Sequence, residues 1–296
     1  MPTTGPGETT GPGQADPGWT EAADALWRVR PGFRLADVDP AGTPGFEGGK
    51  RDGAAALAAG AGELGELQER LFAASTQGAT DRVLLILQGM DTAGKGGVVR
   101  HVMGSVEPQG VALTAFKRPT AEEAAHDFLW RIERRLPAPG IIGVFDRSHY
   151  EDVLIQRVRG MASPEEIERR YGAIARFESA LAASGCRVLK VMLRIGRDEQ
   201  KSRLLARLDA PEKRWKYTTG DLDERLRWDA YEEAYQAALD RTSAPSAPWY
   251  VVPADAKWYA RLAVQRLLIG VLREIDPRWP AVGYDVARER ERLLRS

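Results

Sequence analysis

Short apolar runs alternate with longer, periodically apolar segments from residue 81 onward. The runs have the length of buried strands, and we place five of them: Arg82–Leu87, Val111–Phe116, Ile141–Phe145, Arg187–Leu193 and Trp249–Val252. The segments between them are long enough to form helices. Regular alternation of strands and helices is typical of a mostly parallel sheet wrapped by helices, so the pattern predicts an α/β fold with a five-stranded sheet.

Polar residues mark where several helices begin. A side-chain oxygen followed three residues later by an acid indicates a helix start, because the two groups satisfy backbone N–H groups that lack a partner within the helix. This signal occurs at Thr120 with Glu123, at Ser163 with Pro164 and Glu166, and at Asp221 with Glu224. Upstream of the first strand, leucines spaced for one helical face predict an amphipathic helix over Ala54–Ala74.

The composition divides the chain into four parts. Residues 1–19 are rich in Pro, Gly and Thr and lack the apolar side chains that would offset the entropy of ordering, which predicts a disordered tail. An N-terminal arm that ends in the amphipathic helix follows over residues 20–80. Residues 81–276 hold the predicted sheet, and residues 277–296 form a C-terminal extension.

The charge balance narrows the classes of function. The chain has 42 basic and 42 acidic residues, so no overall field favours nucleic acid or an anionic membrane, and neither is expected as a partner. The single cysteine excludes an intrachain disulfide. The N-terminal segment lacks the pattern of a signal peptide and the apolar runs are too short to cross a bilayer, which predicts a cytoplasmic protein.

The first predicted strand runs into a glycine-rich loop. Residues 89–95 read G-x-x-x-x-G-K between a strand and a helical segment, which is the context that a P-loop (Walker A motif) requires. The glycines let successive backbone N–H groups point at phosphate oxygens, and Lys95 adds a mobile positive charge. The phosphate- and nucleotide-binding residues predicted here are Gly89, Met90, Thr92, Ala93, Gly94, Gly96 and Gly97.

Two aspartates are candidate ligands of a divalent metal ion. A Ser or Thr normally follows the loop lysine and binds Mg²⁺, but this chain has Gly96. Asp91 is the nearest carboxylate, and it would repel a phosphate unless a cation lay between them; capping of a turn is the alternative role. The third predicted strand ends in Asp146, as in a Walker B motif, and Arg147 follows as a phosphate-binding cation. These residues favour Mg²⁺-dependent phosphoryl transfer.

A basic segment follows the fourth predicted strand. Residues 190–216 hold nine Lys or Arg and four acids, although the whole chain is neutral. A solvated charged face is the ordinary explanation, but a lid that closes over phosphates fits the local excess better. We place this lid at about residues 197–220, with Lys201, Arg203, Arg207, Lys213, Arg214 and Lys216 as its cations.

From about Leu67 to Leu272 the sequence resembles the polyphosphate kinase 2 family. The segments that carry the resemblance are residues 88–97, 116–120, 127–131, 145–153, 211–216 and 247–254. Glu151 follows Tyr150 where the ADP-specific class has Asn, so the chain is similar to the class that accepts nucleoside mono- and diphosphates. Gly96 departs from the Asp that many relatives carry after the loop lysine.

The resemblance implies a P-loop kinase fold related to thymidylate kinase. It also implies transfer of phosphate between inorganic polyphosphate and nucleotides with Mg²⁺, for which Mn²⁺ is a substitute. By position, Asp91 and Asp146 would hold the metal, Lys95 and Arg147 would contact the transferring group, and Glu151 would belong to the catalytic set.

The resemblance also implies where the polymer and the nucleotide bind. Arg207, Lys213 and Arg214 would form part of the lid and of a polyphosphate channel, and Lys117 and Arg118 would lie near bound phosphate. The expected partners are polyphosphate with ADP/ATP, AMP and GDP/GTP, and a second copy of the chain in a homo-oligomer.

Two other functions share parts of this pattern. An ATP-dependent nucleoside monophosphate kinase needs only a pocket for its donor, whereas a long polyanion needs an extended basic track, so the basic segment favours polyphosphate. A non-enzymatic nucleotide switch would leave Asp146 and Arg147 without a purpose, and a guanine-specific N-K-x-D motif is absent. The terminal phosphate of a nucleotide is already ionised near pH 7, so no histidine base is required, and we expect His149 to have a structural hydrogen-bonding role. Trp228, Tyr231 and Tyr235 recur at helical spacing, which predicts a packed helix face.

Overall fold

Five parallel strands form a single sheet in the computed structural model, which describes residues 18–296. The order across the sheet is β2-β3-β1-β4-β5, and every neighbouring pair is parallel. The strands are β1 Arg82–Gln88, β2 Val111–Ala115, β3 Ile142–Asp146, β4 Cys186–Arg194 and β5 Trp249–Pro253. Every predicted strand end lies within one residue of the observed end, which confirms the predicted α/β fold.

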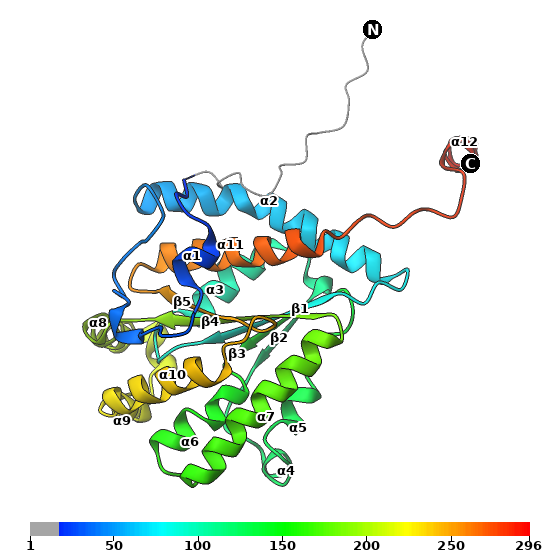
Figure 1. The fold of residues 1–296 in the computed structure, drawn as a ribbon. Coiled ribbons are helices and arrows are strands. Elements are labelled where there is room, and N and C mark those ends of the chain that lie inside the picture. Colours follow the sequence, from blue (N-terminus) through cyan, green and yellow to red (C-terminus); the bar gives the residue numbers. More distant parts are fainter. Residues whose placement is uncertain (1–17) are drawn as a thin grey trace.

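Helices connect the strands and cover both faces of the sheet (Figure 1). The α-helices are α1 Ala23–Trp27, α2 Lys50–Ser75, α3 Lys95–Val102, α4 Ala121–Ala124, α5 Trp130–Glu133, α6 Ile155–Val158, α7 Pro164–Ala183, α8 Arg197–Asp209, α9 Thr219–Arg225, α10 Trp228–Thr242, α11 Lys257–Ile275 and α12 Val286–Leu294. Short 3₁₀ helices include η4 (His149–Asp152) and η5 (Pro211–Lys216). Among the described residues, no helix combines the length and the apolar composition that a bilayer crossing requires.

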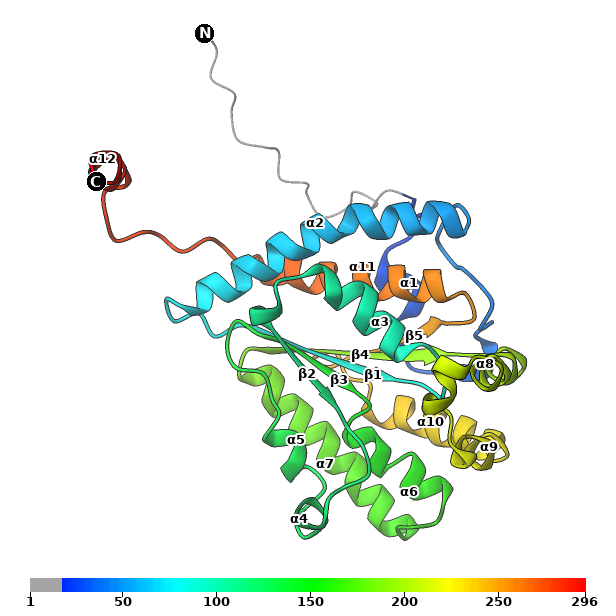
Figure 2. The same cartoon turned by 180° about the vertical axis from the view of Figure 1, so that it is seen from behind.

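The central strand β1 supplies apolar side chains to two separate cores. Val83, Leu85 and Leu87 pack with α2, α3 and α11 on one face, and Leu84 and Ile86 pack with α7 and α10 on the other. Figures 1 and 2 show these two helical layers from opposite sides. A strand that is buried on both faces is apolar at successive positions, which explains why β1 is a continuous apolar run. The carboxyl ends of the strands all point to one edge of the sheet, where α8 and α9 lie.

The N-terminal arm packs on the body of the protein. Trp19, which the sequence prediction assigned to a disordered tail, is only 6% exposed and lies edge-on to Trp27 at 5.2 Å and Phe46 at 5.1 Å between ring centroids. The prediction of disorder is therefore wrong for Trp19, because its aromatic side chain packs into an apolar site beside Tyr259 of α11. The rest of the predicted tail, residues 1–17, lies outside the described residues.

Two of the three helix starts predicted from polar residues are observed. Ser163 caps α7 as predicted, and Thr120 and Glu123 make both hydrogen bonds of a capping box. Helix α4 nevertheless ends after one turn at Ala124, because Asp127 caps a new turn by accepting from the backbone N–H of Leu129. The prediction that Asp221 begins a helix is wrong: α9 begins at Thr219, and Asp221 lies in its first turn, where it accepts from the Thr218 hydroxyl.

Candidate functional site

The P-loop lies at the carboxyl end of β1 and leads directly into α3. Its backbone adopts positive φ at Gly89 (148°), Thr92 (65°) and Gly94 (114°), a region in which glycine is unstrained and other residues are rare. The chain therefore curls tightly around the position that a phosphate would take. The Lys95 ammonium is turned into this curl and donates to the carbonyl oxygen of Gly89 at 2.6 Å. Burial, reinforced by the charge of Arg147, lowers the pKa of Lys95.

Gly89 has no room for a side chain. A Cβ atom there would lie 2.7 Å from the carbonyl oxygen of Leu193 on β4 and 3.1 Å from Cβ of Ala93. We expect Gly89→Ala to displace the loop and to lower kcat/KM about 100-fold, since a shift of about 1 Å in a positioning group has that effect. Steady-state kinetics with the substrates that the sequence resemblance implies, polyphosphate and ADP, would measure it.

Gly270→Ala is the matched control for that substitution. Gly270 lies within α11, and a Cβ atom there would have no neighbour within 4 Å, so alanine should leave the kinetics unchanged. Equal activity of the two variants would contradict the role that the geometry gives to Gly89.

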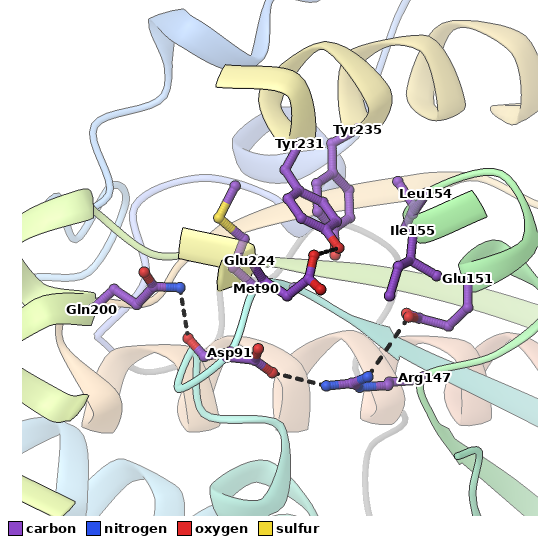
Figure 3. A pocket seen from close by; sticks show the side chains of 11 residues that line it. Met90, Asp91, Arg147, Glu151, Leu154, Ile155, Gln200, Glu224, Tyr231 and Tyr235 are labelled. Atoms are coloured by element: carbon purple, nitrogen blue, oxygen red, sulfur yellow. Dashed lines mark hydrogen bonds and ion pairs between the residues drawn. The ribbon is translucent and has the colours of Figure 1, made fainter. Parts of the chain in front are cut away.

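Asp91 and Glu151 hold the guanidinium of Arg147 between them (Figure 3). Nη2 of Arg147 donates to Oδ1 of Asp91 at 2.8 Å, and Nη1 lies 3.7 Å from Oε2 of Glu151. The Glu151 carboxylate, with a smaller contribution from Asp91, raises the pKa of Arg147 above its usual value despite partial burial. Arg147 itself has φ of 64°, so its side chain is aimed by an unusual backbone conformation directly after β3. An arginine positioned in this way beside the P-loop can bind a phosphate if the phosphate replaces part of its contact with these acids.

Asp146 ends β3 beside the start of the P-loop. In the parallel register, Asp146 pairs with Leu87 of β1, and the backbone N–H of Arg147 donates to the Leu87 carbonyl at 3.0 Å. The charges of both Asp91 and Asp146 act on Lys95 and Arg147. The fold thus brings the two predicted metal ligands, the loop lysine and the arginine to one end of adjacent strands, as expected for residues at the carboxyl edge of a parallel sheet.

A small cavity opens on the Asp91 side of the P-loop. We call it the acidic pocket; its volume is about 50 Å³, and its lining residues are Gly89, Met90, Asp91, Arg147, Glu151, Leu154, Ile155, Gln200, Glu224, Tyr231 and Tyr235. Glu224 on α9 accepts a hydrogen bond from the Tyr231 hydroxyl at 2.6 Å and is ion-paired with Arg159. The contact with Tyr231 ties α9 to α10 at the pocket (Figure 3), and the ion pair with Arg159 ties α9 to the end of α6.

A larger groove opens on the other side of the loop. We call it the cationic groove; its volume is about 460 Å³, and it is lined by the second half of the P-loop, by α8 and η5, and by α11. Its charged lining residues are Arg203, Arg207, Lys213, Lys216, Lys257 and Arg261, with Glu199 as the one acid among them. The lining residues of the acidic pocket and the cationic groove do not overlap in the described part of the chain. The P-loop therefore lies between a pocket lined by several acidic residues and a groove lined mainly by basic ones.

The comparisons with known proteins decide the family. The family model for polyphosphate kinase 2 matches residues 48–279. The chain belongs to the polyphosphate kinase 2 family. It is 44% identical over 256 residues to an AMP/ADP-polyphosphate phosphotransferase of Meiothermus ruber, covering 86% of this chain and 94% of that one. It is 43% identical over 248 residues to an ADP-polyphosphate phosphotransferase of Rhodopseudomonas palustris, covering 78% and 84%.

A solved structure of the polyphosphate kinase 2 family has the same fold. The crystal structure of polyphosphate kinase 2 from Arthrobacter aurescens TC1 superposes with a TM-score of 0.92 at 56% identity, covering 96% of this chain and all of that one. The family match begins 19 residues before Leu67, where we expected the resemblance to start, and so includes all of α2. The predicted P-loop kinase fold is confirmed.

The predicted lid cations divide into two groups in this member of the polyphosphate kinase 2 family. Arg207, Lys213 and Lys216 line the cationic groove, whereas Lys201 and Arg214 are exposed outside it. Arg203 lines the groove but is buried and donates to the carbonyl oxygens of Thr92 (2.8 Å), Ala254 (2.7 Å) and Asp255 (2.7 Å). Arg203 therefore ties α8 to the P-loop and to the end of β5. The number of basic residues in the segment could not distinguish this structural role from binding of phosphate.

Other predicted binding residues lie farther from the two cavities. Lys117 and Arg118 are exposed after the carboxyl end of β2, and neither lines the acidic pocket or the cationic groove. Gly96 is exposed on the first turn of α3, while Gly97 lines the groove. Their part in binding phosphate stays a prediction.

The sequence reasoning missed several lining residues. Tyr231 and Tyr235 were interpreted as a packed helix face; Tyr235 is buried as expected, but both also line the acidic pocket. Lys257 and Arg261 of α11 line the cationic groove, although they lie more than 40 residues beyond the basic segment. Their spacing of four residues at the start of a helix that follows the last strand was the available signal, because that helix begins at the same sheet edge as the P-loop.

Proposed function

We propose that this protein is an enzyme that transfers phosphoryl groups, with Mg²⁺, between inorganic polyphosphate and adenine nucleotides, accepting both AMP and ADP. The observation that carries the proposal is the position of the P-loop between a pocket with aromatic and acidic residues and a groove lined by six cations. The named activities of the relatives and Glu151 in place of Asn support mono- and diphosphate acceptors. GDP and GTP are proposed as further substrates, because the described lining of the pocket offers no feature specific to adenine.

The acidic pocket is the proposed site of the nucleotide acceptor. Tyr231, Tyr235 and Ile155 provide apolar and aromatic surface for a base or ribose, and Arg147 provides the cation for its phosphate. A cavity of about 50 Å³ is far smaller than a nucleotide, so α9 must move when the acceptor enters. The contacts of Glu224 with Tyr231 and Arg159 are those that this movement would break.

The cationic groove is the proposed site of polyphosphate. Six cations and one carboxylate line it, so its lining carries a net positive charge. Glu199 is paired with Arg203, and the ion pairs of Arg207 with Asp221 and of Lys213 with Glu212 reach acids outside the lining. A single ATP molecule would need fewer positive charges than the groove offers. A linear chain with one negative charge or more at each phosphate matches an open, elongated cationic surface.

Chemistry in this arrangement depends on positioning and charge. A terminal phosphate oxygen of the acceptor attacks the terminal phosphorus of the polymer, a new P–O bond forms, and the bridging P–O bond of the polymer breaks to leave a chain shorter by one phosphate. The attacking oxygen is already ionised near pH 7, so no base is needed. Lys95 and Arg147 stabilise the charge on the transferring group and orient it between the two cavities.

Asp91 and Asp146 are the proposed holders of Mg²⁺. No group of three or more His, Cys, Asp or Glu suited to a metal is found among residues 18–296. Two carboxylates nevertheless fit this ion, because Mg²⁺ is commonly bound through one or two carboxylates together with substrate phosphates and water. When bound, Mg²⁺ supplies positive charge to the phosphates, and Mn²⁺ should substitute for it. Asp91 would exchange part of its contact with Arg147 for the metal.

A donor and acceptor panel tests the proposal. Purified protein with Mg²⁺ and long-chain polyphosphate should convert AMP to ADP and ADP to ATP, scored by separation of the nucleotides. The same protein with ATP and AMP in place of polyphosphate should produce much less ADP. The alternative of an ATP-dependent nucleoside monophosphate kinase predicts the reverse result, and phosphorylation of AMP by ATP alone would overturn the proposal.

A further inference from the structure

Arg131 of α5 is buried and links the segment that follows β2 to the segment that follows β3. Its side chain is only 6% exposed, and Nη1 donates to the carbonyl oxygen of Lys117 at 2.9 Å. Nη1 also lies 3.7 Å from Oε2 of Glu123, and Nη2 lies 3.8 Å from Oδ2 of Asp152. One guanidinium therefore contacts both ends of residues 117–123, which follow β2, and also η4, which follows β3.

The segment after β2 carries the cations Lys117 and Arg118 beside the end of β3. The backbone N–H of Phe116 donates to the carbonyl oxygen of Asp146 at 3.0 Å, and the two cations follow within two residues of this contact. Both of their side chains are exposed. Arg131 holds the backbone of this segment through the Lys117 carbonyl, and its guanidinium carbon lies 5.4 Å from the centre of the Phe116 ring. Arg131 thus fixes the main chain from which two exposed cations extend.

Asp152 connects Arg131 to the residues of the acidic pocket. It lies on η4 directly after Glu151, which lines the pocket and is ion-paired with Arg147. Arg170 of α7 secures Asp152 as well, because its Nη1 donates to the Asp152 carbonyl at 2.9 Å and lies 3.7 Å from Oδ1. Burial raises the pKa of Asp152 to about 6, but the charges of Arg131 and Arg170 oppose that shift, so the carboxylate is ionised at neutral pH.

We infer that Arg131 is a positioning residue of the nucleotide site, which holds the two cations after β2 at a fixed distance from Arg147. This inference rests on the proposed function, which places the phosphate of the acceptor at Arg147. Arg131 lines neither the acidic pocket nor the cationic groove, so it acts through its neighbours. Arginine suits this position because its planar fork of donors can contact several acceptors at fixed angles. A displacement of about 1 Å in a positioning group is enough to impair binding or turnover.

Arg131→Gln should weaken the binding of nucleotide and leave the binding of polymer unchanged. We expect KM for AMP and for ADP to rise about tenfold, the effect of losing one charge-assisted contact to the acceptor phosphate. KM for polyphosphate and kcat should stay within about twofold of wild type, because the lost contact binds ground state and transition state alike. Calorimetry of ADP binding without polyphosphate should show the same rise in Kd, about tenfold. A role in stability alone would reduce the amount of active protein and would change neither KM nor Kd.

A background without the two cations tests whether Arg131 acts through them. In Lys117→Gln/Arg118→Gln, the further change Arg131→Gln should raise KM for ADP by no more than about twofold, because the effects of residues that share one interaction are not additive. A further tenfold rise in that background would overturn the inference. Asp152→Asn keeps the size of the side chain and removes the charge that Arg131 faces, so it should raise KM for ADP about threefold. This variant decides the matter if Arg131→Gln does not fold, since an unchanged KM would then contradict the inference.

Arg135→Gln is the matched control, because it makes the same change at an exposed arginine four residues later and should leave every constant unchanged. The outcomes also separate the inference from the proposed function. If wild-type protein forms no nucleotide product from polyphosphate, the proposed function fails, and Kd for ADP alone decides the inference; absence of ADP binding removes both. If wild type uses polyphosphate but Arg131→Gln leaves KM for nucleotides unchanged, or raises KM for polyphosphate equally, only the inference is overturned.

Discussion

Asp146→Asn should lower kcat by about 10²–10³-fold while leaving the protein folded. The substitution keeps the size of the side chain and removes one of the two carboxylates at the carboxyl end of β1 and β3. A fixed charge that acts on the transferring group commonly contributes an effect of this size. The variant should also need more Mg²⁺ for half-maximal activity, which a titration of rate against metal concentration would measure.

Asp81→Asn is the control for this change. Asp81 precedes β1 at the amino end, so the same substitution is made in the same sheet but at the opposite edge. It should leave kcat and the metal requirement unchanged. Turnover of Asp146→Asn near the wild-type rate would show that the metal assignment is wrong.

Lys190→Met should destabilise the protein by about 3–5 kcal/mol, the usual result of leaving a buried charge without its partner. Lys190 is completely buried on β4, and its ammonium donates to Oε2 of Glu178, to the Tyr150 hydroxyl at 3.0 Å and to the Thr242 carbonyl at 2.8 Å. Three acceptors for three N–H groups are what a charged ammonium requires. Methionine would fill the space but leave the Glu178 carboxylate buried and unpaired, and chemical denaturation would measure the loss.

The double variant Lys190→Met/Glu178→Gln identifies the cause of that loss. Glutamine removes the negative charge but keeps an oxygen that can accept from Tyr150 and His149, which contact Oε1 of Glu178 at 2.8 and 3.2 Å. We expect the double variant to be about 1–3 kcal/mol more stable than Lys190→Met alone, as for directly coupled groups. A double variant that is less stable than Lys190→Met would mean that lost packing, and not the unpaired charge, dominates.

This buried cluster also includes His149, for which the sequence predicted a structural role. His149 is fully buried, and burial lowers its pKa, although the hydrogen bond with Glu178 opposes the shift. With Tyr150 it secures η4, the segment that follows Arg147 and carries Glu151, to the interior of the protein. The predicted structural role of His149 is consistent with this position.

The fold was largely predictable because its strands are apolar on both faces, and because β1 is followed by a P-loop and β3 ends in an aspartate. Continuous apolar runs located β1, β3 and β4, and the loop after β1 could be interpreted from its glycines and Lys95. The sequence also placed Asp146 correctly beside the loop, because parallel strands share a carboxyl edge.

The parts that could not be predicted depend on contacts between distant segments. Nothing local to Arg203 indicates that it binds carbonyl groups of the P-loop and of the chain after β5, since those partners lie 51 to 111 residues away. Trp19 is an isolated aromatic residue in a polar segment, and its burial follows from contacts with the distant Trp27, Phe46 and Tyr259. Arg261 belongs to the cationic groove because α11 packs beside α3; its spacing from Lys257 indicated a shared helix face but not which groove that face lines.

The two cavities on either side of the P-loop have a consequence for the order of events. With nucleotide and polymer in the sites proposed for them, a finished nucleotide would leave without passing the polymer. The shortened polymer would then stay in place, advance by one phosphate and react with the next nucleotide. Such an enzyme would consume one chain through many successive turnovers, and chains of intermediate length would be scarce while it works.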